Sequence, residues 1–122
     1  MHRNINAPAD HVWDLLTDTN AWPTWGPSVR SATVDGGHLT TGATGTIKTV
    51  FGPELSFEIT EFEPGSQWSW KVAGVTATNH TVQPLDAESC RAGFGVPIAA
   101  TPYLTVCRVA LTRLQRLAEV AA

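Results

Sequence analysis

The last twenty residues carry the clearest pattern in the chain and limit what the rest can form. Between Thr101 and Glu119, apolar side chains recur at spacings of three and four, with polar ones between them. That spacing predicts an α-helix with one buried stripe. Thr101 is placed to cap its first turn, and Pro102 suits the first helical position. The stripe consists of Leu104, Cys107, Ala110, Leu111, Leu114, Leu117 and Ala118.

A helix of about 18 residues is some 27 Å long and needs an apolar surface of matching length. The chain has 122 residues, of which 43% are hydrophobic and 16% are charged. This composition suits one domain with a real core and argues against disorder. We therefore expect a single domain over residues 1–122, in which everything before Thr101 supplies the surface for the helix.

Charge and hydropathy exclude several kinds of partner. The net charge of −3 and the pI of about 5.7 give no basic field for a phosphate backbone, so no nucleic acid is expected. No apolar run approaches the roughly 20 residues that span a bilayer, so no stable membrane insertion is expected. The start MHRNINAPAD lacks the features of a secretory signal, which predicts a cytoplasmic protein.

Cys90 and Cys107 form no CxxC pair, which predicts reduced buried thiols. A homodimer is left open.

A strand and a helix are predicted near the N-terminus. His2–Asn6 is a short polar run that suits an edge strand, with Ile5 as its apolar anchor. Pro8 then opens a helix that ends by about Thr19, because two prolines and a glycine follow within NAWPTWGPS. The apolar side of this helix is Val12, Trp13, Leu15 and Leu16. In the segment that follows, we expect Trp22 and Trp25 to plug one end of the core.

From Val29 to Val96 the pattern changes to short runs separated by turn residues. This is typical of an antiparallel meander. In the last run, Cys90, Ala92, Phe94 and Val96 form an apolar inner face. The runs cover residues 29–34, 39–41, 44–51, 54–62, 67–73, 76–83 and 89–96.

The clearest hairpin surrounds Pro64-Gly65. A two-residue turn there places the large apolar side chains of both strands on one face and complementary polar side chains on the other. The expected pairs are Phe57–Val72, Glu58–Lys71, Ile59–Trp70, Thr60–Ser69 and Glu61–Trp68.

The registers on either side of this hairpin stay open. A two-residue Gly52-Pro53 turn points Lys48 inward, whereas a three-residue turn points Ile47 inward instead. Across Gly74-Val75, a tight turn points His80 outward. However, His80 lies on the same side of its strand as the apolar Val82, which favours the core.

These elements predict an α+β fold with a cavity. A meander of six or seven strands twists and becomes concave, and glycines such as Gly42 and Gly45 let it bend. A straight helix cannot fill a concave surface at every level. We therefore expect a hollow between the sheet and the terminal helix.

The chain resembles the SRPBCC superfamily, in its branch of polyketide cyclases, dehydrases and lipid-transport-like proteins. The segments that carry the resemblance cover nearly the whole chain and are HVWDLLTDTNAWPTWGPSV, GATGTIKTVFG, FEITEFEPGSQWSWKVAG, NHTVQP and PYLTVCRVALTRL. The resemblance implies a helix-grip fold, in which a curved six- to seven-stranded antiparallel sheet wraps around a long C-terminal helix over a hydrophobic cavity. One or two short helices follow the first strand. HRNIN is shorter and less apolar than the usual first strand of the family.

In such a fold the core residues also form the wall of a ligand cavity. The expected ligand-binding residues are Phe57, Ile59, Trp70, Val72, Phe94, Tyr103, Leu104, Cys107 and Leu111.

Acid–base chemistry in the cavity needs titratable groups at proton-transfer distance from a bound carbonyl or hydroxyl. His80 and Glu61 are the candidate catalytic residues, and Lys48 and Tyr103 are further candidates. The alternative interpretation of His80 is a hydrogen-bonded structural residue, and that of Glu61 is a carboxylate at the rim. No metal is expected, because the four histidines are scattered and no HxH or HExxH motif occurs. No cofactor is expected either, since GATGTI lacks the spacing of a dinucleotide fingerprint.

Three functions agree with these features. The first is binding of a hydrophobic small molecule, lipid-like or polyketide-like, in the cavity. The second is a polyketide cyclase or dehydratase that uses His80 or Glu61. The third is an interaction module whose cavity is filled by some of the five tryptophans.

Overall fold

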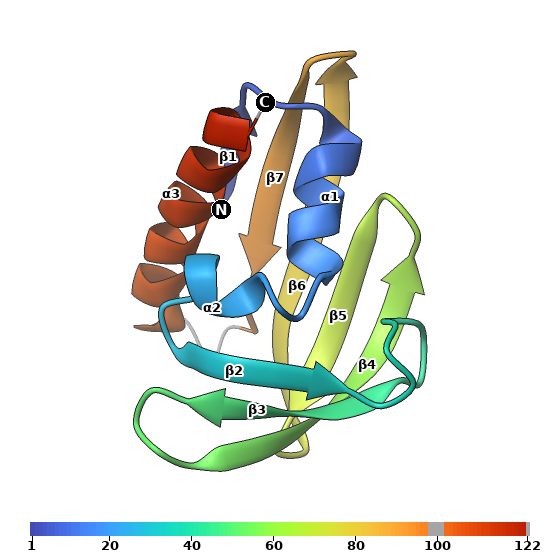
Figure 1. Cartoon of the computed structure of the whole chain (residues 1–122), viewed down its shortest axis with the longest axis vertical. Coiled ribbons are helices and arrows are strands. Elements are labelled where there is room, and N and C mark those ends of the chain that lie inside the picture. The colour runs from blue at the N-terminus through green and yellow to red at the C-terminus, as the bar shows by residue number, and fades with distance from the viewer. Residues whose placement is uncertain (98–101, 122) are drawn as a thin grey trace.

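The computed structural model describes residues 1–97 and 102–121, which form an α+β fold around one seven-stranded antiparallel sheet. The strand order is β1-β7-β6-β5-β4-β3-β2, and α1 and α3 lie against one face of the sheet (Figure 1). The elements in chain order are β1 (His2–Ile5), α1 (Ala9–Thr17), α2 (Trp22–Trp25), β2 (Val29–Val34), β3 (Thr44–Thr49), β4 (Glu54–Glu63), β5 (Gln67–Val72), β6 (Val75–Asp86), β7 (Ser89–Gly95) and α3 (Leu104–Ala121).

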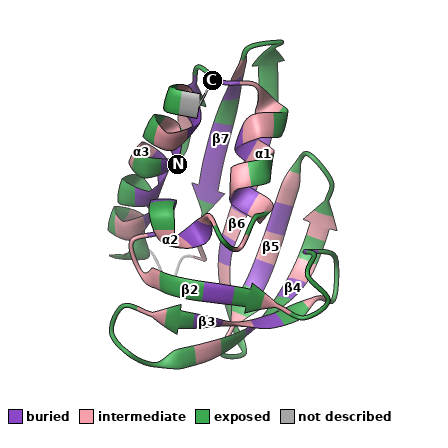
Figure 2. Ribbon diagram, in the orientation of Figure 1, coloured by how far each residue is buried: buried purple, intermediate pink, exposed green. Residues whose placement is uncertain are grey.

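The C-terminal helix confirms the stripe that its spacing predicts. Helix α3 buries Cys107, Ala110, Leu111, Leu114 and Ala118. The polar residues between them are half-buried or exposed (Figure 2). Leu104 and Leu117, at the edges of the stripe, are half-buried. The predicted cap Thr101 lies outside the described residues. No helix of the described chain is both long and apolar enough to cross a membrane.

The first strand is the edge strand that the sequence predicts. Strand β1 pairs with β7 alone, and Ile5 is fully buried as its anchor. Arg3 ties this edge to α3, because its guanidinium donates hydrogen bonds to Thr112 Oγ1 and, at 3.5 Å, to Gln115 Oε1. The short strand is therefore held on both sides.

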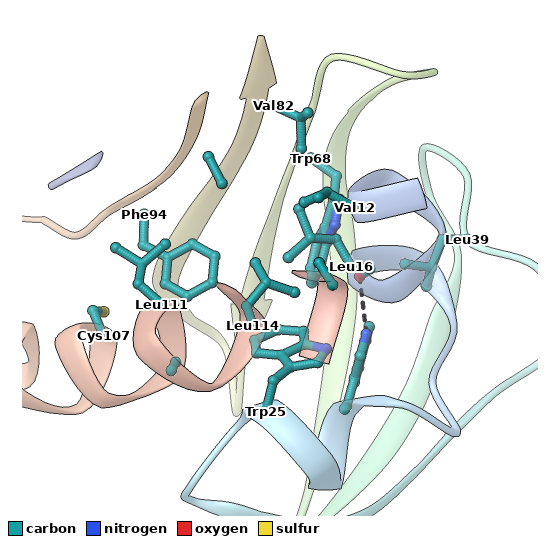
Figure 3. Packing of buried hydrophobic residues seen from close by; sticks show 14 of the residues in the cluster. Val12, Leu16, Trp25, Leu39, Trp68, Val82, Phe94, Cys107, Leu111 and Leu114 are labelled. Atoms are coloured by element: carbon teal, nitrogen blue, oxygen red, sulfur yellow. Dashed lines mark hydrogen bonds between the residues drawn. The ribbon is translucent and has the colours of Figure 1, made fainter. Parts of the chain in front are cut away.

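Helix α2 is the single turn that the two prolines allow, and it fixes two tryptophans in the core. Trp22 Nε1 donates to the Leu16 carbonyl at 2.9 Å, and Trp25 Nε1 donates to the Leu15 carbonyl at the same distance. Both carbonyls belong to the last turns of α1, where a helix has no internal donors for them. Figure 3 shows how Trp25 packs with Phe94 and the α3 leucines. The pair closes one end of the core, as predicted.

The β4–β5 hairpin has the predicted register at its centre and a different one near its turn. The pairs Phe57–Val72, Glu58–Lys71 and Ile59–Trp70 are confirmed. A β-bulge between Ile59 and Glu61 then shifts the strands, so that Glu61 pairs with Ser69 and Phe62 with Trp68. The expected inward position of Glu61 is therefore wrong. Its side chain is exposed, and Phe62 occupies the inner side because burying an aromatic ring there is more favourable than burying a carboxylate.

A second bulge settles the orientation of His80. Val72 pairs with Val75 across a tight Ala73-Gly74 turn in which both residues have positive φ. The register shifts by one residue between Ser69 and Lys71, and His80 then lies opposite Trp68 on the inner face. A tight turn and an inward histidine coexist because β6 inserts one extra residue.

The β3–β4 connection also resolves an open register. Ile47 pairs with Leu55 and is buried, whereas Lys48 pairs with Glu54 and is exposed. Residues 39–41, expected as a short strand, form a loop instead, although Leu39 is buried. Gly45 lets these strands approach closely, because a Cβ there would lie 2.2 Å from the Thr33 carbonyl and 2.6 Å from the Phe57 ring. Strands β2 and β3 run across the lower end of the sheet (Figure 1).

Candidate ligand-binding site

The described residues line a large hollow on the inner side of the curved sheet, which is partly open to solvent at exposed Phe51 and Val75 and which we call the outer chamber. Its volume is about 380 Å³, and its lining is mostly apolar. Strands β3 to β6 supply most of the wall, and the segments around Ser28 and Tyr103 complete it. The lining residues are Ser28, Val29, Ile47, Thr49, Phe51, Leu55, Trp70, Val72, Val75, Thr76, Ala77, Thr78, Val96, Pro97 and Tyr103.

A much smaller hollow of about 40 Å³, the inner chamber, adjoins the outer one. It lies between α2, the inner face of β5 to β7 and the first turns of α3. Its lining residues are Trp22, Trp25, Gly26, Pro27, Ser28, Val29, Trp68, Trp70, Thr78, His80, Phe94, Tyr103, Val106, Cys107 and Ala110. The residues that border both chambers are Ser28, Val29, Trp70, Thr78 and Tyr103.

Local sequence explains why the hollow lies where it does. Beneath the middle of α3, Leu111 lies beside Phe94 and Leu114 lies toward Leu16 of α1, and these apolar side chains fill the space (Figure 3). Toward the first turn of α3, the facing residues on β6 are the smaller Ala77 and Thr78, both of which line the outer chamber because the β6 bulge lies beside them. The cavity is therefore at the N-terminal end of α3 and not along its whole length.

His80 is the histidine at the inner chamber, and it is almost completely buried. Its ring stacks on Trp68, with centroids 3.7 Å apart and planes inclined by 18°. Nδ1 lies 3.2 Å from the Trp68 carbonyl oxygen. Burial lowers the pKa of His80 from 6.5 to about 3, and the hydrogen bond to Trp68 opposes this shift only in part. The imidazole therefore stays neutral at physiological pH.

This lowered pKa predicts a stability that falls on mild acidification. In the unfolded chain His80 takes up a proton near pH 6.5, whereas in the folded protein it stays neutral until about pH 3. The unfolded state binds more protons in that window, so stability rises with pH there. Between pH 6 and pH 5 we expect a loss of about 1 kcal/mol from this residue, measurable by urea unfolding.

The comparison that isolates His80 is His80→Phe, which should lose less stability than the wild type over the same pH step. His38→Phe makes the same change on the exposed loop between β2 and β3 and should keep the wild-type pH dependence. An equal loss of stability in the wild type and in His80→Phe would contradict this explanation.

The structure brings together about half of the expected site residues. Those that line one or both chambers are Trp70, Val72, Phe94, Tyr103, Cys107 and His80. Five others lie elsewhere. Phe57, Ile59 and Leu111 are buried in the filled part of the core, Leu104 is half-buried outside both linings, and exposed Glu61 is also outside them.

Several lining residues are absent from the sequence-based set. Trp22, Trp25 and Trp68 form much of the inner wall, and Ala77 and Thr78 form part of the outer wall. The WPTWGP segment predicts that Trp22 and Trp25 plug one end of the core, but it gives no sign that they line a hollow there. Ala77 and Thr78 carry no such signal, because their shared inward orientation depends on the bulge.

Hydroxyl groups mark the boundary between the chambers. The Ser28 Oγ and Tyr103 Oη atoms lie 3.0 Å apart in a hydrogen bond that joins the segment before β2 to the start of α3. Thr78, which borders both chambers, is buried. No Asp, Glu, Lys or Arg side chain lines either chamber within the described residues, and these residues also contain no cluster of three or more His, Cys, Asp or Glu side chains suited to a metal ion.

Comparison with known proteins places this architecture among proteins of one family. Residues 1–119 match the family described as "Polyketide cyclase / dehydrase and lipid transport". A search of curated proteins finds no match.

Solved structures share the fold at low sequence identity. XoxI from Bacillus cereus superposes with a TM-score of 0.73 at 13% identity, covering 97% of this chain and 92% of that one. The di-domain ARO/CYC protein BexL gives a TM-score of 0.74 at 16% identity, covering 99% of this chain and 45% of that one. A norcoclaurine synthase point mutant from Thalictrum, in complex with a transition-state analogue, gives 0.61 at 12% identity, covering 97% of this chain and 91% of that one. At these identities the likeness shows the fold alone.

Proposed function

Since this chain belongs to the polyketide cyclase/dehydrase and lipid transport family, within the SRPBCC superfamily that its motifs resemble, we propose that it binds an apolar small molecule in the two chambers. The ligand is polyketide-like or lipid-like in being largely hydrophobic. Its body occupies the outer chamber, and the inner chamber receives one end of it.

The observation that carries this proposal is the outer chamber itself. A volume of about 380 Å³ lies within the usual range of about 300–1,000 Å³ for small-molecule pockets. Its wall combines aliphatic residues such as Ile47 and Val72 with the aromatic Trp70, and a few hydroxyl groups lie among them. Such a wall removes apolar ligand surface from water, which is favourable by roughly 25 cal/mol per Å².

The chemistry of the site favours binding over acid–base catalysis. A cyclase or dehydratase needs a group that gives up a proton and one that accepts it. His80 has a pKa of about 3 and is a weak base, and Glu61 is exposed outside the chambers. BexL is a di-domain ARO/CYC protein of a biosynthetic pathway, but the likeness to it concerns the fold. A role as an interaction module with a filled cavity is disfavoured by the open outer chamber.

Titration with the neutral dye Nile red tests this proposal in the intact wild-type protein. We expect saturable binding at one site, with a blue-shifted and stronger emission as the dye enters an apolar environment. A competing neutral naphthalene should displace the dye from the same site. An emission unchanged from that in buffer, at protein concentrations up to the millimolar range, would refute the proposal.

A further inference from the structure

We propose that the inner chamber selects a ligand that is uncharged and ends in a hydroxyl group, with Nε2 of His80 as the acceptor of the hydroxyl hydrogen. This inference rests on the proposed function, because it names the chemical class of ligand for the same site. It assigns to His80 a role in recognition that needs no proton transfer.

The tautomer of His80 follows from its hydrogen bond. Nδ1 lies 3.2 Å from the Trp68 carbonyl oxygen, and a carbonyl oxygen can only accept. Nδ1 therefore carries the hydrogen, and Nε2 of the neutral ring has a free lone pair. Within the described residues, no donor bonds to Nε2.

Aromatic neighbours hold the imidazole in this orientation. Trp68 stacks on one face, and Phe94 contacts the ring edge-on with centroids 5.2 Å apart. Trp70 and Trp25 approach edge-on at 5.9 and 6.5 Å. The ring is thus packed on several sides, so the acceptor is fixed before a ligand arrives.

The two chamber volumes set the size of the ligand's parts. A hollow of about 40 Å³ has room for a water-sized group but not for an aromatic ring. The outer chamber, at about 380 Å³, has room for a ring system. Because Trp70, Thr78 and Tyr103 border both, a ligand can keep its body in the outer chamber and extend a hydroxyl toward His80.

Charge and hydrogen-bonding chemistry favour a hydroxyl over the other common polar end groups. Burying a carboxylate is costly without a cation, and no Lys or Arg side chain lines either chamber in the part of the chain that the structure describes. The burial that holds the pKa of His80 near 3 prevents the ring itself from supplying that cation. A carbonyl or ether oxygen could accept from the indole N–H groups of Trp68 and Trp70, which are buried without a partner among the described residues, but it would leave the Nε2 lone pair without a donor. A hydroxyl group supplies the hydrogen that Nε2 requires, and its oxygen can also accept from one of these indoles.

A matched set of naphthalenes tests the inference on the wild-type protein at pH 7. The probes are 2-naphthol, 2-methoxynaphthalene and 2-naphthoate, which share one ring system. Binding is followed through the indole N–H signals of the tryptophans in two-dimensional NMR spectra. We expect 2-naphthol to bind about 3- to 10-fold more tightly than 2-methoxynaphthalene, as one hydrogen bond provides, and 2-naphthoate to bind at least about tenfold more weakly than either.

Two variants test whether His80 causes the preference for 2-naphthol over 2-methoxynaphthalene. His80→Phe should bind 2-naphthol and 2-methoxynaphthalene equally, whereas His38→Phe, on an exposed loop, should keep the wild-type ratio. The ¹⁵N shift of Nε2 in the wild type provides a readout that does not depend on a folded variant. We expect 2-naphthol to move that signal and 2-methoxynaphthalene to leave it in place.

The outcomes separate this inference from the proposed function. Equal affinities for 2-naphthol and 2-methoxynaphthalene in the wild type, or tightest binding of 2-naphthoate, would overturn the inference and leave apolar ligand binding intact. If Nile red and all three naphthalenes fail to bind, the proposed function and the inference both fall.

Discussion

Replacement of Trp22 by alanine should lower the free energy of unfolding by about 3–5 kcal/mol, the usual loss for a buried tryptophan. Trp22 is only 2% exposed and stacks on Trp68, with ring centroids 5.4 Å apart and planes inclined by 12°. It also meets Phe57 and Trp70. Its loss removes these contacts and leaves the Leu16 carbonyl without the indole donor. Since small domains are stable by about 5–15 kcal/mol, this variant should lose a large part of its stability.

Denaturant unfolding followed by circular dichroism measures this loss. Trp13→Ala is the matched control, because Trp13 is half-buried and meets the aromatic ring of Phe62, at a centroid distance of 5.6 Å. It should lose clearly less stability than Trp22→Ala. A loss below about 1 kcal/mol for Trp22→Ala would mean that the aromatic plug is not part of the stable core.

Filling the outer chamber should abolish ligand binding while the fold persists. Ala77 is half-buried on β6 and lines this chamber, so the indole of Ala77→Trp would project into space that is empty in the wild type. Small-to-large changes in a packed core cost about 1–3 kcal/mol, but here the added volume meets a hollow, and stability should change little. The affinity for Nile red should fall by at least about 30-fold, which corresponds to roughly 2 kcal/mol.

Ala87→Trp provides the control for this binding experiment. Ala87 is exposed in the turn between β6 and β7 and lines neither chamber, so the same change there should leave the affinity for Nile red unaltered. Wild-type affinity in folded Ala77→Trp would place the bound dye outside the outer chamber.

The parts of the fold that follow from local periodicity could be predicted from the sequence. The α3 stripe and the inner face of β7 each repeat one spacing without interruption, and both are as expected. The centre of the β4–β5 hairpin is also as expected, because Ile59 and Trp70 must share the buried face.

The bulges could not be predicted, and they changed the candidate site. Each adds one residue to a strand and reverses the facing of everything beyond it. One bulge moved Glu61 to the solvent side, and another brought His80 to the inner face across a tight turn. Counting residues outward from a turn assumes a regular ladder, and no residue type in these strands marks where that regularity ends.

The position of the cavity also lay beyond the sequence. A buried stripe on α3 fixes which residues face the sheet, but not which of them meet a filled core. Leu111 and Ile59 are opposed by other apolar side chains, whereas Val72 faces the outer chamber, although all three carry the same pattern of apolar positions. The difference depends on the sizes of side chains from distant segments, which only the assembled fold brings together.

The central claim is that the hollow at the N-terminal end of α3 holds an apolar ligand. The most direct measurement is a set of intermolecular nuclear Overhauser effects between bound 2-naphthol and the protein's methyl groups. We predict contacts from the naphthalene protons to the methyl groups of Val72 and Ala77, which line the outer chamber. Contacts confined to methyl groups outside it, such as those of exposed Leu85 and Val120, would contradict the account.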